Sequence, residues 1–320
     1  MKIAFMGTPA FAGDILEWIL KFQEVDCKLV VSQPDREVWR KKELQKTAVK
    51  IVAENNNIEV LQPEKLRNNQ LFLDTLKSLD LDFIVVVAYG KIIPKDILEI
   101  PKYGCINIHG SILPKYRWAS PVQAAIKNGE SETWLTIMYM SEGMDEWDML
   151  KIGKINIDNV DTSEDIFKKF VQIGPELLIQ TLREIVSWDI EWFPQNESEA
   201  TYCWKITRED GEVFFQEQSA QEIYDTYRAY TPWPWIFTSY EGKRLVIEKC
   251  YVSAEWDIVE NHSREITPGE FIQMDKKHFW IVTSDKRFLM VESLKLEWKK
   301  SMDVMSFING NKEIIWYKFK

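Results

Sequence analysis

The chain has 320 residues, which is long enough for about two domains with full hydrophobic cores. Hydrophobic residues make up 45% of it and charged residues 28%, a globular composition that excludes a disordered or collagen-like chain. The net charge of −10 argues against a surface that is basic overall, although it leaves room for a local basic patch.

The cysteines and histidines give no sign of a disulfide or a metal site. The four cysteines, at positions 27, 105, 203 and 250, show no CxxC motif, so we expect buried free thiols in a reducing compartment. The three histidines lack ligand spacing, and no metal is expected. The N-terminal apolar stretch is broken by Gly7-Thr8-Pro9, and the longest apolar run, 83–89, is too short to span a bilayer. We therefore expect a cytoplasmic protein.

The first part of the chain alternates short apolar strands with amphipathic helices. The run 83–88 is hydrophobic throughout, as expected for a strand buried on both faces of a parallel sheet. The expected strands are 2–6, 27–32, 59–61, 83–88, 105–108 and 135–140, and the expected helices are 11–22, 49–55, 69–79 and 122–127. This alternation predicts an α/β, Rossmann-like domain over residues 1–188, with a parallel sheet and helices on both faces.

The pattern changes after residue 188. Residues 189–212 are rich in Glu, Asn, Ser and Gln and are expected to form a linker. A helix is expected over 220–228. Short strand-like segments separated by turn residues follow at 236–240, 244–252, 269–274, 279–283 and 288–292. This spacing predicts a small antiparallel, OB-like β-barrel over residues 213–320.

Asn107 and His109 are the first candidate site residues. Strand alternation puts their side chains on the same face at the end of the strand that begins at Cys105. Open α/β folds bind ligands at the carboxyl edge of the parallel sheet. A carboxamide and an imidazole placed there can polarise a carbonyl and move a proton. A structural Asn and His at a strand end is the alternative that spacing leaves open.

An acidic turn, residues 141–148, follows the expected strand 135–140. We therefore expect this turn at the carboxyl edge of the sheet as well. Asp145 within it can orient His109 and stabilise the protonated imidazole through its charge. A solvated acidic turn is the alternative interpretation.

The loop after the second strand carries a local basic patch. Six basic and three acidic residues lie between positions 35 and 50 of a chain that is acidic overall. Basic loops of this kind contact the phosphates of nucleic acids. A solvated surface loop is the alternative.

Together these motifs resemble the methionyl-tRNA formyltransferase family, and the resemblance runs nearly end to end. The most specific segment is CINIHGSILP at 105–114, in which Ile112 stands where the family usually has Leu. Other matching segments are FMGTP at 5–9, SQPDR at 32–36, VVVAYG at 85–90 followed by Pro94, TIM at 136–138, GMD at 143–145, TPWP at 231–234 and GKRL at 242–245. The Asn-x-His-x-Ser-x-Leu-Pro motif marks folate-dependent formyltransferases in general, and the C-terminal segments narrow the resemblance to the enzyme that acts on tRNA.

The resemblance implies a reaction and a set of site residues. Asn107, His109 and Asp145 would transfer the formyl group of 10-formyltetrahydrofolate to the α-amine of methionine on initiator tRNA. The implied folate-binding residues are Val87, Tyr89, Gly90, Ser111, Ile112, Leu113 and Pro114. The implied tRNA-binding residues are Arg36, Arg40, Lys41 and Lys42, and Arg40 stands where the family has its key arginine. The barrel would be a further tRNA platform, and a monomer is expected.

The basic loop departs from the family pattern. The family usually has small residues and proline at the positions of Glu37, Trp39, Lys41 and Thr47. The sequence therefore does not predict the conformation of this loop.

The sequence leaves two other classes of function open. One is a related folate-dependent formyltransferase that acts on an amino sugar or hydrolyses formylfolate, although such an enzyme would not need the basic loop together with the barrel. The other is a non-catalytic folate- or tRNA-binding protein of the same fold, which the presence of all three catalytic residues disfavours. A nucleotide-binding dehydrogenase is disfavoured because no GxGxxG follows the first strand.

The tryptophan content is unusual. The chain has 13 glycines and 14 tryptophans, so glycine is only about 4% of its residues where about 7% is average. The resembling family usually has glycine at the positions of Trp39, Trp118, Trp134, Trp147, Trp188, Trp235 and Trp298, whereas Trp233 matches a family tryptophan. Some bacterial lineages read UGA as glycine, and we hypothesise that several of these residues are glycine in the natural protein. Genuine tryptophans with rearranged packing are the alternative.

Overall fold

A computed structural model describes residues 1–37, 44–253, 265–273 and 278–320. The chain forms two compact units. The first comprises Met1–Pro121, Glu132–Asn156 and Ile166–Trp204, and the second comprises Val122–Ser131, Ile157–Asp165 and Lys205–Lys320. No helix in the described parts of the chain has the length and apolar character needed to cross a membrane.

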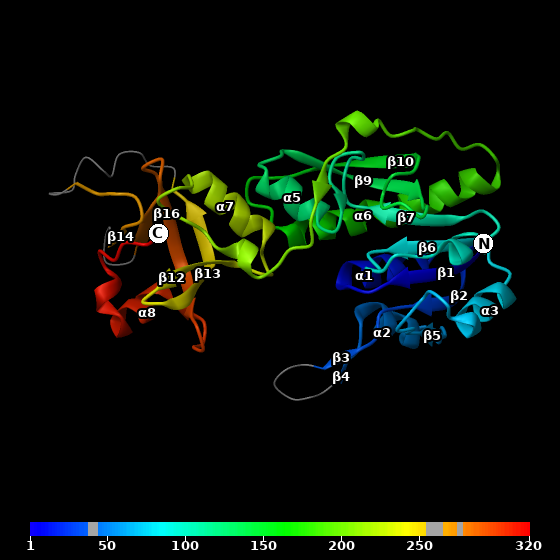
Figure 1. The fold of residues 1–320 in the computed structure, drawn as a ribbon, viewed down its shortest axis with the longest axis horizontal. Coiled ribbons are helices and arrows are strands. Elements are labelled where there is room, and N and C mark those ends of the chain that lie inside the picture. Colours follow the sequence, from blue (N-terminus) through cyan, green and yellow to red (C-terminus); the bar gives the residue numbers. More distant parts are fainter. Residues whose placement is uncertain (38–43, 254–264, 274–277) are drawn as a thin grey trace. The chain divides into compact units, whose positions relative to one another are not determined.

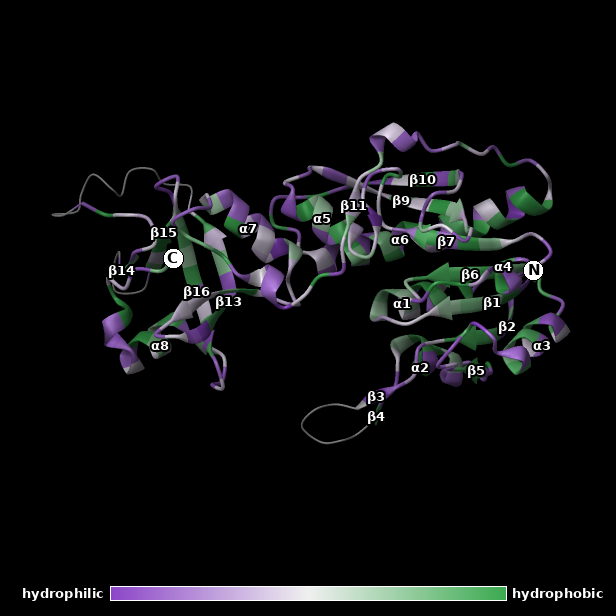
Figure 2. Cartoon of the chain, viewed as in Figure 1, coloured by the Kyte–Doolittle hydropathy of each residue, from purple (hydrophilic) through white to green (hydrophobic). Residues whose placement is uncertain are grey.

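The first unit is built on a seven-stranded sheet in the order β10-β9-β7-β6-β1-β2-β5 (Figure 1). Its strands are β1 Lys2–Gly7, β2 Asp26–Val31, β5 Val60–Leu61, β6 Phe83–Val87, β7 Cys105–His109, β9 Glu132–Tyr139 and β10 Met149–Asn156. Five neighbouring strands of this sheet pair in parallel, as predicted: β5, β2, β1, β6 and β7. All five residues of β6 are buried, and Figure 2 shows this strand in the hydrophobic colour.

The prediction of a wholly parallel sheet is wrong at one edge. Strand β9 is antiparallel to β7, and β10, which the sequence analysis did not identify, is antiparallel to β9. The helix between β7 and β9, α5 (Pro121–Lys127), was predicted. Nearly all of it belongs to the second unit. The chain returns to the sheet at the end where β7 finished, and β9 must therefore run in the opposite direction.

Helices cover both faces of this sheet, as predicted. They are α1 Ala10–Ile19, α2 Ala48–Asn55, α3 Gln70–Ser78, α4 Lys95–Leu98 and the long α6 Ser163–Val186. On one face, Phe72 of α3 and Ile97 of α4 pack with Ile84 of β6. On the other, α6 passes so close that a Cβ on Gly174 would lie 2.9 Å from the side chain of Leu135 in β9. The fold is the predicted Rossmann-like α/β arrangement with a mixed sheet.

The second unit contains the predicted antiparallel strands. These are β12 Ile236–Tyr240, β13 Lys243–Val252, β14 Phe271–Gln273, β15 Phe279–Val282 and β16 Phe288–Leu296, with the short β17 Met302–Asp303 beside β16. Helix α7 (Ala220–Ala229) was predicted, and it begins with a capping box formed by Ser219 and Glu222. Helix α8 (Val304–Gly310) follows β17.

Backbone hydrogen bonds close the two edges of this sheet. The amide of Val213 donates to the carbonyl of Phe237 in β12 at 2.9 Å, and the amide of Phe215 donates to the carbonyl of Lys320 at 2.6 Å. Residues 316–319 in turn pair with residues 269–271 at the β14 edge. The segment 212–215 thus links β12 to the C-terminal residues, and these link to β14. This closure confirms the barrel.

Several tryptophans have a left-handed backbone. Trp118, Trp188, Trp235, Trp298 and Trp316 have φ between +59° and +89°, a region that favours glycine because it has no Cβ. The first four are among the seven suspected positions, and Trp316 is additional. Of the other three, Trp39 lies outside the described residues, whereas Trp134 and Trp147 do not have positive φ.

Candidate active site

Loops after three parallel strands meet at the carboxyl edge of the sheet. The hydroxyl of Thr8, after β1, and the amide nitrogen of Gln33, after β2, both donate to the carbonyl of Tyr89, after β6, at 3.1 and 2.8 Å. Gly90 has φ +78°, and a Cβ there would lie 2.7 Å from Gln33 Nε2. This position favours glycine, and hydrogen bonds from Thr8 and Gln33 tie the neighbouring carbonyl of Tyr89.

The side chains of the first folate segment are buried. Val87 is completely buried, and Tyr89, 1% exposed, packs in the core between the sheet and α3. Burial raises the pKa of the Tyr89 hydroxyl to about 12. What this segment offers to a ligand is therefore its backbone.

Asn107, His109 and Asp145 lie together at the end of β7. The carboxamide of Asn107 donates to Asp145 Oδ1 at 3.5 Å, and His109 Nδ1 lies 3.7 Å from Asp145 Oδ2. The side chain of His109 is 7% exposed and that of Asp145 16%. Strand alternation correctly placed Asn107 and His109 on one face.

The route by which Asp145 reaches this place differs from the expected one. Because β9 is antiparallel to β7, its last residue, Tyr139, pairs with Ile106, and the amide of Met140 donates to the carbonyl of Cys105 at the start of β7. The loop therefore leaves the sheet at the amino edge of β7, and the expectation that it follows a carboxyl edge is wrong. Residues 141–148 turn back, with φ +59° at Asp145, and carry the carboxylate to the other end of β7.

The segment after β7 supports both catalytic candidates through its backbone. The carbonyl of Tyr116 lies 3.1 Å from His109 Nε2, and the amide of Trp118 donates to Asp145 Oδ2 at 2.9 Å. Both nitrogens of His109 thus face acceptors, and both can donate only when the imidazole is protonated. The bond from residue 118 uses the main chain, so either tryptophan or glycine can make it.

The second folate segment, 111–114, has mostly buried side chains. Ser111, Leu113 and Pro114 are buried, and Ile112 is partly exposed. The Ser111 hydroxyl donates to the carbonyl of Lys115 at 2.6 Å, so it shapes the loop. Ile112 is the residue of this segment whose side chain is open to a ligand.

A cluster around the buried Arg117, which the sequence analysis missed, lies against the same loop. Arg117 is completely buried and pairs with Glu197, whose hydrogen bond with Arg117 holds the pKa of the Glu197 carboxyl below its ordinary value. Gln195 lies between Arg117 and the Asp145 loop. Both partners come from the segment expected to be a linker, whose polar composition gave no signal of this role.

The described part of the basic loop is a short hairpin of β3 (Arg36–Glu37) and β4 (Leu44–Gln45). Arg36 donates to Gln33 Oε1 at 3.3 Å. Two other cations are used in ion pairs, Lys46 with Glu54 at 2.7 Å and Lys50 with Asp35 at 2.6 Å. Arg40, Lys41 and Lys42 lie outside the described residues.

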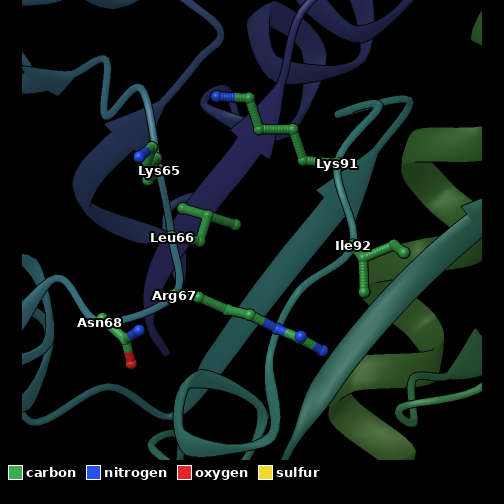
Figure 3. Close-up of a pocket in the computed structure, with 6 residues that line it drawn as sticks. All are labelled: Lys65, Leu66, Arg67, Asn68, Lys91 and Ile92. Carbon is green, nitrogen blue, oxygen red and sulfur yellow. The ribbon is translucent and has the colours of Figure 1, made fainter.

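A surface hollow of about 410 Å³ lies beside the first folate segment. Figure 3 shows its lining residues, which come from the segment after β5 and the segment after β6: Lys65, Leu66, Arg67, Asn68, Lys91 and Ile92. The ammonium group of Lys91 donates to the carbonyls of Pro63 and Glu64. None of the predicted site residues lines this hollow.

The four cysteines are free, and three of them are buried. Burial raises the pKa of Cys105 to about 12 and that of Cys203 to about 11, so both thiols are protonated at neutral pH. Within the described residues, no group of three or more His, Cys, Asp or Glu side chains is arranged to hold a metal ion.

Comparison with known families matches both parts of the chain. Residues 1–182 match the family described as formyl transferase, and residues 205–312 match the formyl transferase C-terminal domain. The fold and the site therefore define an enzyme of the formyl-transferring class.

Curated relatives narrow this class. The methionyl-tRNA formyltransferase of Caldicellulosiruptor saccharolyticus is 40% identical over 312 residues, which cover 98% of this chain and 97% of that protein. The methionyl-tRNA formyltransferase of Clostridioides difficile is 40% identical over 311 residues, 97% of each chain. The chain belongs to the methionyl-tRNA formyltransferase family.

Solved structures share the fold at low sequence identity. The sugar 3N-formyltransferase WlaRD, determined with dTDP and 5-N-formyl-THF, has a TM-score of 0.63 and 18% identity, covering 94% of this chain and 99% of its own. HypX from Aquifex aeolicus in complex with tetrahydrofolic acid has a TM-score of 0.65 and 13% identity, covering 98% of this chain and 48% of its own.

Proposed function

We propose that this enzyme transfers the formyl group of 10-formyltetrahydrofolate to the α-amine of methionine esterified to initiator tRNA, the step that prepares this tRNA for translation initiation. The observation that carries the proposal is the meeting of Asn107, His109 and Asp145 at the end of β7, in a chain that belongs to the methionyl-tRNA formyltransferase family.

A folate donor is supported by the family and by its structural neighbours. WlaRD and HypX were determined with folate compounds. In this chain the fixed backbone at Tyr89–Gly90 and the partly exposed Ile112 would contact the folate, with Val87, Ser111, Leu113 and Pro114 supporting those positions from the core.

The three catalytic residues fit an addition–elimination reaction. The amine of methionine attacks the formyl carbon, and the carbonyl oxygen becomes an oxyanion as the C–N bond forms. Asn107 can donate a hydrogen bond to the oxyanion, and a protonated His109 stabilises it through its positive charge. Asp145 holds His109 and accepts, directly or through a water, the proton that the amine loses. The bond between the formyl carbon and N10 then breaks, and N10 takes a proton as tetrahydrofolate leaves.

The tRNA would be held by two regions. Arg36, Arg40, Lys41 and Lys42 of the basic loop would contact phosphates near the acceptor end. The barrel of the second unit would supply further contacts. An acidic chain needs such local cations to bind a polyanion.

A comparison of acceptors tests this function. The purified enzyme is given labelled 10-formyltetrahydrofolate with methionyl initiator tRNA, with a dTDP-amino sugar, or with no acceptor. We expect label on the aminoacyl-tRNA alone. Transfer to the sugar without transfer to tRNA would contradict the proposal, and release of formate without an acceptor would indicate a hydrolase.

A further inference from the structure

The loop that carries Asp145 needs an external support. It leaves β9 at the amino edge of β7, so pairing within the sheet does not bring Asp145 to His109. Its backbone is tied instead by the carboxamide of Gln195. Gln195 Nε2 donates to the carbonyl of Asp145 at 2.8 Å and to the carbonyl of Trp147 at 2.6 Å. One side chain therefore fixes the loop on both sides of residue 146.

The orientation of this carboxamide is set by Arg117. Gln195 Oε1 accepts from Arg117 Nε at 3.1 Å and from Nη2 at 2.8 Å. A guanidinium can only donate and a carbonyl can only accept. If the amide oxygen and nitrogen of Gln195 exchanged places, the NH2 group would face the guanidinium donors and the oxygen would face the two loop carbonyls. Only one orientation therefore satisfies every partner.

Arg117 is itself held by a carboxylate. Its side chain is completely buried, and Nη1 and Nη2 donate to the two oxygens of Glu197 at 2.9 and 2.6 Å. A buried guanidinium needs such a bidentate partner. The neighbouring backbone is also tied, because β8 (Arg117–Trp118) pairs with β11 (Tyr202–Cys203).

We propose that Gln195 is a positioning residue for formyl transfer, which acts through Asp145 and is itself oriented by the Arg117–Glu197 pair. The same short strand, β8, supplies the amide of residue 118 that binds Asp145 Oδ2. The segment after residue 193 is thereby part of the catalytic apparatus. This proposal rests on the proposed catalytic role of Asp145.

A double-mutant cycle tests it. Gln195→Glu has the same length and still accepts from Arg117, but it cannot donate to the two loop carbonyls. We expect kcat to fall about 10- to 100-fold, with KM for both substrates and the melting temperature close to those of the parent. In an Asp145→Asn background the same change should alter kcat by less than about twofold, because its effect passes through Asp145. Gln23→Glu, on an exposed loop, is the matched control and should leave kcat unchanged.

Two results would overturn the proposal. An equal fold-loss in both backgrounds would assign Gln195 a merely structural role, and a parental kcat for Gln195→Glu would assign it none. Gln195→Met, which is neutral and of similar length, gives the same cycle if the glutamate variant does not fold. The Asp145→Asn variant by itself separates failure of the Gln195 proposal from failure of the proposed function. A parental rate for this variant would refute the catalytic role of Asp145, and with it the proposed function.

Discussion

The carboxylate of Asp145 lies 3.7 Å from the Nδ1 atom of His109, although the two residues leave the sheet at opposite ends of strand β7. Strand topology alone would keep them apart by the length of that strand. Their meeting depends on the turned-back loop and on the hydrogen bonds that hold it. The site can therefore be damaged through this loop while the fold stays intact.

Replacing His109 with alanine should abolish most of the transfer while folate binding persists. The imidazole stabilises a charge that exists in the transition state and not in the bound substrate. We expect kcat to fall by about 10²- to 10⁴-fold, measured by formylation of methionyl-tRNA, with the Kd for a folate analogue nearly unchanged. Activity within a few-fold of the parent would remove His109 from the catalytic group.

Asp145→Asn should also lose most of its rate. Asparagine keeps the shape of the side chain but has no charge and cannot take up the proton of the amine. We expect a loss of about 10²- to 10⁴-fold in kcat and a changed pH–rate profile, with an unchanged melting temperature as the control for folding. A profile that matches the parent's would contradict the proposed role.

The sequence predicted the parts of the fold that hydrophobic period and turn residues determine. The continuous apolar run of β6 identified a central strand, and the predicted helix 220–228 matches α7 to within one residue. Strand β10 was missed because its buried and exposed residues do not alternate regularly, and it lies at the edge of the sheet. The antiparallel direction of β9 depends on which end of β7 the chain returns to, which is a tertiary property that no local pattern contains.

The candidate site could likewise be predicted only in part from the sequence. The two-residue period placed Asn107 and His109 on one face. Asp145 was proposed from the acidic turn after strand 135–140 and from the family motif, but the route by which it reaches His109 was not predicted, because that route depends on a loop reversal. Gln195 was not predictable, since it lies 50 residues from Asp145 in a polar stretch that resembles a linker. Its role is defined by the partners that the fold brings to it.

Arg40→Ala should weaken the use of tRNA without changing folate binding. If Arg40 contacts a phosphate, its removal should lower tRNA affinity and reduce the salt dependence of that affinity by about one phosphate contact. Lys46→Ala is the matched control from the same basic loop, because Lys46 is paired with Glu54. Affinity that is unchanged for Arg40→Ala at both low and high salt would make this loop a solvated surface.

The pair between Asp35 and Lys50 should contribute stability that depends on pH. Desolvation is the largest influence on the Asp35 carboxyl and raises its pKa. Hydrogen bonds from Gln62, Lys50 and the Thr47 backbone, together with the positive charge of Lys50, outweigh it, so the pKa lies below its ordinary value. The contribution is therefore present above about pH 4 and is lost as the pH falls through the lower pKa of the folded state.

Asp35→Asn tests this sign. At pH 7 the free energy of unfolding of the variant should be about 1–2 kcal/mol lower than that of the parent. This difference should shrink as the pH falls below about 4. Urea unfolding at pH 7 and pH 3 measures it. Asp26→Asn, which removes an exposed ion pair with Lys28, should change stability by less than about 0.5 kcal/mol. A difference for Asp35→Asn that stays constant with pH would contradict the argument.

Tryptophan is over-represented among the residues with a left-handed backbone. Thirteen non-glycine residues in the described ranges have positive φ, and five of them are tryptophan, the bulkiest side chain. Asparagine and aspartate are the non-glycine residues usually found in this region. They account for four of the other eight residues: Asn57, Asn68, Asp80 and the site residue Asp145. Trp188 and Trp298 are moreover 84% and 93% exposed, so no packing compensates for the strain. These observations fit glycine at the same positions.

Mutation and mass spectrometry give the decisive results. In a protein made with tryptophan, Trp188→Gly and Trp298→Gly should each stabilise the fold by about 1 kcal/mol, because glycine removes the Cβ clash at positive φ. Trp18→Gly is the matched control: Trp18 is half-exposed but lies within helix α1, where glycine should destabilise by about 1 kcal/mol. In protein isolated from the source cells, tryptic peptides spanning positions 118, 188, 235 and 298 should carry glycine. Peptides with tryptophan at these positions would end the hypothesis, whatever the stability of the variants.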